Sequence, residues 1–136
     1  MNLKQQITSK FDKSIWKDIK LDDYDCIDKY IRDFIIEINK YNNITTSYSC
    51  EGHKESDRAY LYFKVDNDGW VIFWNTILPE LSYLLNGIFD LSVMDNPYSS
   101  GINIGCILKT NEFYNWEELK VLFWKQIIET FNKYYK

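Results

Sequence analysis

The stretch Ala59-Tyr60-Leu61-Tyr62-Phe63-Lys64-Val65 decides the class of fold. Apolar side chains alternate in it with tyrosine and lysine at a period of two, which is typical of a strand with one buried and one outward face. The side chains expected to face the core are Ala59, Leu61, Phe63 and Val65. The strand must therefore pack one face against other elements, and the flanking sequence indicates which.

Upstream of this strand, the sequence predicts a helix, a strand and a loop. Apolar residues recur at helical spacing between Ile27 and Ile38, with acidic residues before them, which predicts a helix over residues 23–41. Asn42-Asn43 can adopt the left-handed conformation that ends a helix. Residues 44–50 read as a strand with Thr46, Tyr48 and Cys50 on one face, and residues 51–58 as a polar loop. Before all of these, residues 1–21 carry apolar side chains every four positions and are expected to form short helices.

Downstream, the pattern continues with turns, strands and two more helices. Residues 66–69 (Asp-Asn-Asp-Gly) are expected to form a turn. Residues 70–75 are a continuous apolar run that fits either a buried strand or the start of a helix capped by Asp68, and periodicity does not separate the two. A helix is expected from Thr76 to Asn86-Gly87, and strands are expected over 88–94 and 102–108, joined by a long turn.

The last helix is the most strongly marked element. Asn115 precedes an apolar stripe and Glu118 follows three residues later, which is the spacing of a capping box. The order of elements is helix-strand-strand, helix-strand-strand, helix. We therefore expect one α+β domain over residues 1–136, with a mixed or antiparallel sheet of about four to five strands and helices mainly on one face.

Composition limits the functions that the chain can have. The formal net charge is −4, the pI is near 5.0, and Arg32 and Arg58 are the only arginines. Binding of duplex nucleic acid needs a basic face and is therefore not expected. The three cysteines follow no framework spacing, and no apolar run approaches the length that spans a bilayer. We expect a cytoplasmic protein with free thiols and no membrane association.

The segment Thr45-Thr46-Ser47-Tyr48-Ser49-Cys50-Glu51-Gly52-His53 holds the only histidine of the chain and is the candidate site. Cys50 and His53 have a spacing that metal sites use, but a structural zinc needs four ligands. Asp57 or Asp66 could add a ligand, although nothing in the spacing requires it, so no metal site is predicted. Cys50, with Ser47 or Ser49 as alternatives, could act as a nucleophile with His53 as its base. No residue that would orient His53 is evident, so catalysis stays open.

Ligand recognition is the hypothesis that this segment favours. Gly52 permits close approach of backbone amides to an anion, and Arg58 can hold a phosphate or carboxylate in a bidentate manner. Tyr60 and Tyr62, on the outward face of their strand, can stack on a base. The predicted ligand is small and anionic, with nucleotide-like chemistry. The candidate ligand-binding residues are Ser47, Ser49, Cys50, Glu51, Gly52, His53, Arg58, Tyr60 and Tyr62.

The same segment resembles the Thr-Thr-Ser-Ser-Cys-Ser-Gly-Arg stretch of the third wybutosine-synthesis protein family. Ser49, Cys50 and Gly52 match it, His53 stands where that family has arginine, and Tyr48 interrupts its double serine. Those proteins are tRNA-modifying methyltransferases of α+β architecture that use S-adenosylmethionine. Similar stretches occur in small uncharacterised proteins of Gram-positive bacteria and their phages. The resemblance implies the helix-strand-loop-strand frame and its pocket.

Two functions follow as alternatives. In the first, the chain is a ligand-binding protein with a pocket at the Ser-Cys-Glu-Gly-His loop. In the second, it is an acidic interaction protein, such as a phage-encoded or mobile-element-encoded inhibitor that binds a protein partner. The aromatic stripe of the last helix covers more than one face and is a candidate homodimer interface. Its members are Trp116, Phe123, Trp124, Phe131, Tyr134 and Tyr135.

Overall fold

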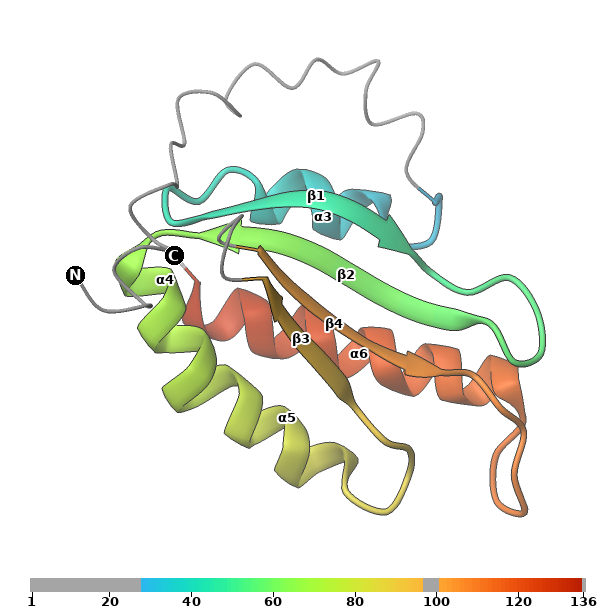
Figure 1. The fold of residues 1–136 in the computed structure, drawn as a ribbon. Coiled ribbons are helices and arrows are strands. Elements are labelled where there is room, and N and C mark those ends of the chain that lie inside the picture. The colour runs from blue at the N-terminus through green and yellow to red at the C-terminus, as the bar shows by residue number, and fades with distance from the viewer. Residues whose placement is uncertain (1–27, 97–100, 136) are drawn as a thin grey trace.

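The computed structural model describes residues 28–96 and 101–135, and within them the chain forms a four-stranded sheet with helices on one face. The strands follow the order β1-β2-β4-β3, and all three neighbouring pairs are antiparallel. Figure 1 shows α6 running behind the central strands, with α3 behind β1 and α5 at the opposite side. The predicted α+β class and the single-faced helical cover are therefore confirmed. The predicted helices within residues 1–21 lie outside the described residues.

Strands β1 (Ile44–Cys50) and β2 (Arg58–Val65) form where their sequences alternate. In β2, the burial of alternate residues is complete and matches the prediction. In β1, the register shifts between Thr46 and Tyr48, so Thr46 lies opposite Phe63 and Tyr48 lies opposite Tyr62. The expectation that these two side chains share a face is therefore wrong, because a bulge moves the strand by one residue.

Strands β3 (Ser92–Asn96) and β4 (Gly101–Ile107) pair as a hairpin that completes the sheet. The strand predicted over 88–94 begins later, at Ser92, while Ile88 and Phe89 pack against the core before it. β4 lies where it was predicted. The connection between the two strands falls on residues 97–100, which are outside the described part.

Helix α3 (Arg32–Ile38) is shorter than the helix predicted over 23–41. Residues 29–31 form a turn before it, and the predicted start lies outside the described residues. Its end is set by Asn39, because the side-chain Nδ2 of Asn39 donates to Ile35 O at 2.8 Å and its Oδ1 accepts from Thr46 N at 2.9 Å. Asn42 and Asn43 do not have the positive φ of the predicted left-handed cap. A side chain bonded to both elements therefore ends α3 and attaches it to β1.

The segment after β2 is helical throughout, which resolves the ambiguity of residues 70–75. It consists of α4 (Asn67–Ile72), a π-helical turn η2 (Phe73–Ile77) and α5 (Leu78–Leu85). The predicted turn at 66–69 is instead the start of α4, and its cap is Asp66, whose carboxylate accepts from Gly69 N at 2.8 Å. The helix thus begins well before the predicted Thr76. The π turn lies just before Pro79, which has no N–H to donate to a helical bond.

Helix α6 (Trp116–Tyr134) confirms the predicted capping box. Asn115 Oδ1 accepts from Glu118 N at 2.9 Å, and Glu118 Oε1 accepts from Asn115 N at 3.1 Å. The helix buries its apolar stripe against the sheet, where the ring of Phe131 makes edge contacts with those of Phe63 and Phe73. These contacts place the centre of the core between α6 and the middle of β2.

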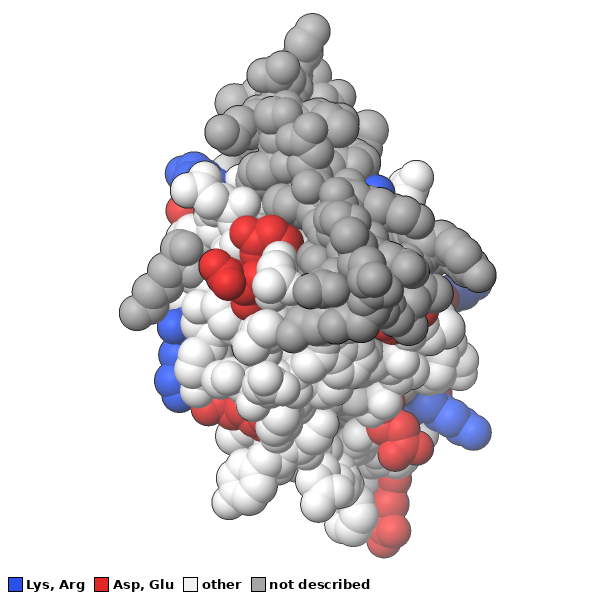
Figure 2. Space-filling model, turned by 60° about the vertical axis from the view of Figure 1, so that its left-hand side comes forward, with Lys and Arg blue, Asp and Glu red and all other residues white. Residues whose placement is uncertain are grey.

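Charged side chains are dispersed over the described surface that Figure 2 shows. On the part of the face in Figure 2 that is not grey, acidic and basic groups lie in small separate clusters with uncharged surface between them. No continuous basic patch is visible on that described surface. Among the helices of the described residues, none combines the length and the apolar character needed to cross a bilayer.

The capping box gives a direct test of the start of α6. Asn115→Ala should lower the free energy of unfolding by about 1 kcal/mol, because the amide of Glu118 loses its acceptor. Asn115→Ser keeps an oxygen acceptor and should stay close to the parent protein. Urea denaturation of the three proteins measures the difference. Equal losses in the serine and alanine variants would contradict the capping role.

Candidate functional site

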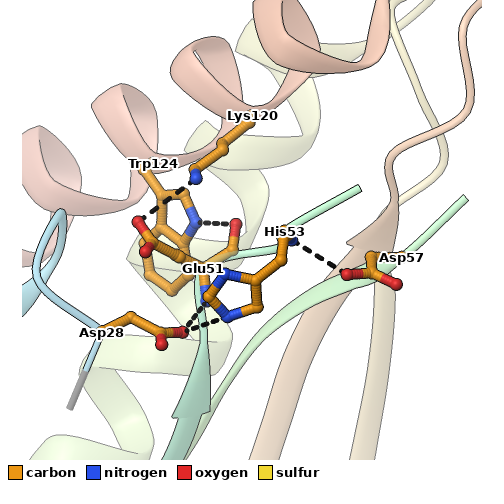
Figure 3. Close-up of polar contacts among 6 residues, drawn as sticks. All are labelled: Asp28, Glu51, His53, Asp57, Lys120 and Trp124. Atoms are coloured by element: carbon orange, nitrogen blue, oxygen red, sulfur yellow. Dashed lines mark hydrogen bonds and ion pairs between the residues drawn. The ribbon is translucent and has the colours of Figure 1, made fainter. Parts of the chain in front are cut away.

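The turn that follows β1 is fixed through the backbone of Glu51 (Figure 3). The indole Nε1 of Trp124, on α6, donates to Glu51 O at 3.0 Å, and this contact is buried. On the other side, Glu51 N donates to Asp28 Oδ2 at 2.8 Å. One residue thus joins the end of β1 to α6 and to the segment before α3.

The side chain of Glu51 does not lie at the rim of an open site, where it was predicted. Glu51 is buried, with 8% of its surface exposed. Its Oε2 lies 3.3 Å from Lys120 Nζ, and this ion pair lacks hydrogen-bond geometry. Lys120 also lies over the ring of Tyr30, 5.4 Å from its centroid. The carboxylate therefore serves to hold the turn against α6, because a buried charge needs a partner.

Gly52 is required by both conformation and packing. Its φ is +89°, and a Cβ at this position would overlap Cδ1 of Leu108. The backbone amides on either side of it already have acceptors inside the protein. Glu51 N donates to Asp28, and His53 N donates to Asp57 Oδ2 at 2.9 Å. The expected cradle for an external anion is thus occupied at these two amides by the carboxylates of the chain itself.

The rest of the turn is bonded to the end of β4, which keeps its shape. Leu108 N donates to Asp57 O at 2.7 Å, and Ser56 N donates to Leu108 O at 2.8 Å. Glu55 accepts from the amide and the hydroxyl of Thr110 at 2.9 and 2.6 Å. Ser56 takes a positive φ of 70° in this arrangement. The turn is therefore held by α6, by β4 and by the segment before α3.

The imidazole of His53 faces Asp28. His53 Nε2 lies 3.2 Å from Asp28 Oδ2, and 55% of the histidine side chain is exposed (Figure 3). Cys50 joins this pair: one ligand atom from each of Asp28, Cys50 and His53 lies within 4.8 Å of the other two. Sequence reasoning missed Asp28, which precedes Glu51 by 23 positions. Its only signal was a carboxylate at the start of a predicted helix, where acidic residues are common.

The two predicted serines lie away from this cluster. Ser49 is paired with Leu61, and Leu61 faces the helices, so Ser49 lies on the covered side of the sheet. Ser47 sits in the bulge of β1, where its Oγ is shielded and has no hydrogen-bond partner among the described residues. Neither serine is therefore placed to act with His53.

The remaining predicted residues gather on the face of the sheet opposite the helices. Cys50 is paired with Tyr60, and Tyr48 with Tyr62. The rings of Tyr48 and Tyr62 lie 6.0 Å apart, and Tyr48 is 70% exposed. We call this the tyrosine face, defined by those outward side chains of the four strands that the structure describes as at least partly exposed. They are Tyr48, Cys50, Arg58, Tyr60, Tyr62, Lys64, Ser92, Met94, Asn103 and Ile107.

The tyrosine face differs in charge from the chain as a whole. Its ionic side chains are Arg58 and Lys64, and no Asp or Glu occupies an outward position in the described strand pairs. Arg58 is held in place: its Nη2 donates to Ser92 Oγ at 2.8 Å, and its guanidinium lies 5.4 Å from the centroid of the Tyr60 ring. Gly105 leaves the space for it, since a Cβ there would lie 2.8 Å from the Arg58 Cζ.

Two of the three cysteines are described, and they differ sharply. Cys106 faces the core, and burial raises the pKa of its thiol to about 12. Cys50 is half-buried on the tyrosine face, and both thiols are free. Cys50 is thus the thiol of the described part that solvent and ligands can reach. Cys26 lies outside the described residues.

The aromatic stripe of α6 is mostly core. Phe123, Trp124, Phe131 and Tyr135 are buried, which leaves Trp116 and Tyr134 partly exposed. Near the start of the helix there is instead an open groove of about 330 Å³ with an apolar floor and acidic residues. It is lined by Tyr114, Glu117, Glu118, Val121 and Leu122. A homodimer through this stripe remains a prediction, and only Trp116 and Tyr134 of the stripe leave aromatic surface exposed for it.

No family model, curated protein or solved structure gives a significant match to this chain. The resemblance to the wybutosine-synthesis family therefore remains a prediction based on one short stretch.

The packing of Gly52 can be tested against a matched glycine. Gly87 also has a positive φ, +82°, but nothing lies within 4 Å of a Cβ built on it. Gly87→Ala should cost about 1 kcal/mol through backbone strain alone. Gly52→Ala should cost about 1–3 kcal/mol more, because the methyl group must displace Leu108. Chemical denaturation measures both, and equal losses would show that Leu108 does not constrain the turn.

Proposed function

We propose that this protein binds a nucleotide-like ligand on the tyrosine face of its sheet. The observation that carries the proposal is that Tyr48, Tyr60 and Tyr62 lie together on one face of the sheet. The charged side chains of that face, among the described strand residues, are basic. In an acidic protein, a face that has Arg58 and Lys64 and, within the described part of the strands, no outward carboxylate suits an anionic ligand. This keeps the predicted ligand class and moves its centre from the Gly52 turn to the sheet.

The aromatic rings supply the contact for a base. Tyr48 and Tyr62 are inclined by 46° to each other with 6.0 Å between centroids, so they do not stack on each other face to face. A planar base can lie against an exposed ring of such a pair, and stacking of this kind tolerates every base. The surface is a platform rather than a closed pocket. It therefore favours a ligand that stacks over one that must be enclosed.

Arg58 supplies the contact for a phosphate. Its hydrogen bond to Ser92 and its position over the Tyr60 ring fix the guanidinium beside the rings. A guanidinium carries five N–H donors, so donation from Nη2 to one serine leaves others for an anion. A base on Tyr48 or Tyr62 and a phosphate on Arg58 would thus be held on one face of the neighbouring strands β1 and β2.

The exposed ring of Tyr48 provides the test of this proposal. The parent protein should bind at least one member of a panel of mononucleotides and their nucleosides, cyclic dinucleotides, S-adenosylmethionine and short single-stranded RNA. Tyr48→Ala should weaken that binding at least fivefold, because stacking of a base on an aromatic ring contributes about 1–3 kcal/mol. Tyr48→Phe keeps the ring and should bind like the parent. Isothermal titration calorimetry gives the affinities.

Tyr83 is the matched control for this experiment. It is an exposed tyrosine on α5, with 83% of its surface accessible, and it lies away from the tyrosine face. Tyr83→Ala should leave affinity unchanged, whereas Arg58→Gln should reduce affinity for phosphorylated members more than for nucleosides. No binding to any member of the panel, or equal losses in Tyr48→Ala and Tyr83→Ala, would contradict the proposal.

The groove on α6 supports a second candidate function, the binding of a protein partner. Its apolar floor is formed by Tyr114, Val121 and Leu122, and Glu117 and Glu118 add negative charge. Phe113, which precedes Tyr114 in the chain, is 77% exposed. Charge complementarity favours a partner segment that carries both apolar and basic side chains.

This second function predicts an effect that the tyrosine face does not share. Val121→Asp should abolish capture of a host protein by the immobilised chain, because it places a charge on the apolar floor. Tyr48→Ala should leave capture intact. Mass spectrometry of proteins retained from a host lysate by the three versions measures this. Capture that depends on Tyr48 and not on Val121 would exclude the groove as the partner site.

A further inference from the structure

We infer that Asp28, Cys50 and His53 form a binding site for a divalent transition metal ion, with zinc as the best-suited ion. The inference goes beyond ligand binding on the tyrosine face and does not depend on it. The Cys50–His53 spacing alone does not predict a metal site, because too few ligands are near in sequence. The fold supplies the third donor, Asp28, which precedes α3 in the chain, whereas Cys50 and His53 follow it.

The distances fit a mononuclear site. One donor atom from each of the three residues lies within 4.8 Å of the other two, and His53 Nε2 is 3.2 Å from Asp28 Oδ2. In a tetrahedral zinc site, bonds of about 2.0–2.3 Å place neighbouring ligand atoms roughly 3.3–3.7 Å apart. Small side-chain rotations therefore bring the three donors to bonding distance from one point.

The donor set selects the class of ion. A thiolate together with an imidazole favours zinc or another late first-row ion over magnesium and calcium, which prefer oxygen ligands. Three protein ligands leave one position of a tetrahedral ion for water or another donor, as in zinc sites that interact with substrates. The site is also open to solvent, because His53 is largely exposed and Asp28 is partly exposed.

The residues around the site hold its ligands in position. Asp28 Oδ2 accepts the amide of Glu51, which orients the carboxylate and leaves other lone pairs for an ion. The backbone of His53 is fixed through its amide to Asp57. Cys50 is fixed by its pairing with Tyr60 in the sheet. All three ligands therefore begin from a rigid frame, so little conformational order has to be gained when an ion binds.

A simple His53–Asp28 ion pair is the competing explanation, and Cys50 distinguishes the two. An ion pair needs no sulfur, whereas a metal site with these ligands does. The test uses the full chain in a Cys26→Ser background, so that the cysteine outside the described residues cannot contribute. The protein is stripped with a chelator and titrated with zinc and then, separately, with cobalt(II).

We expect one zinc ion per chain, and a cobalt complex with a thiolate-to-metal charge-transfer band and tetrahedral visible bands. Cys50→Ser should abolish the charge-transfer band, and Cys50→Ser, His53→Gln and Asp28→Asn should each weaken zinc at least tenfold. Asp28→Asn is informative because its amide oxygen can still accept from Glu51. Tyr83→Ala, outside both proposed sites, should leave zinc affinity unchanged. Circular dichroism confirms that each variant is folded.

A second readout follows the thiol directly. Bound zinc should slow alkylation of Cys50 at least tenfold, while Cys106 stays unreactive with or without the ion because it is buried. Absence of stoichiometric zinc binding would overturn the inference. So would a cobalt complex without the charge-transfer band, or zinc affinity that Cys50→Ser leaves unchanged. Each of these results would identify the cluster as an ion pair beside an unrelated thiol.

Discussion

The backbone of Glu51 is the point on which the arrangement of the site depends. Its carbonyl accepts from Trp124 on α6, and its amide donates to Asp28 before α3. Buried polar backbone groups must find partners, so these two bonds are obligatory rather than incidental. They bring α6 and the carboxylate of Asp28 to the end of β1, although these segments are far apart in the sequence. The contact between Asp28 and His53 follows from that constraint.

The bulge in β1 determines which side chains of this strand face outward. Without it, Thr46 and Tyr48 would lie on one face, since side chains alternate along a strand. The extra residue, at Ser47, lets Thr46 bond with Asn39 at the helix side while Tyr48 turns outward beside Tyr62. The same shift puts Cys50 outward beside Tyr60. The tyrosine face and the position of the reactive thiol therefore share one irregularity of the backbone.

The parts of the fold that were predictable from the sequence are those set by local periodicity. β2 and α6 have regular apolar patterns, and the Asn115–Glu118 capping box marks the start of α6. The start of α4 was not predictable in the same way, because the apolar run from Trp70 to Trp74 fits a buried strand as well as a helix. Its cap, Asp66, became evident only from its bond to Gly69.

The candidate site was also only partly predictable, because one of its residues is distant in sequence from the others. Cys50 and His53 stand out in sequence because they are close together and their chemistry is rare in this chain. A search for further ligands near them leads downstream to Asp57 and Asp66. Asp57 instead binds the His53 amide, and Asp66 caps α4. The missing donor, Asp28, lies upstream, and only the packing of α3 on β1 and α6 brings it near.

Charge is distributed so that the two proposed sites would complement each other. Asp28, Glu51 and Asp57 surround the turn after β1, and their negative charge, offset in part by Lys120, favours a cation there. The neighbouring sheet face has Arg58 and Lys64 and favours an anion. The paired residues Cys50 and Tyr60 lie at the boundary between them. An ion held by Cys50 would therefore lie between a turn that favours cations and a sheet face that favours anions.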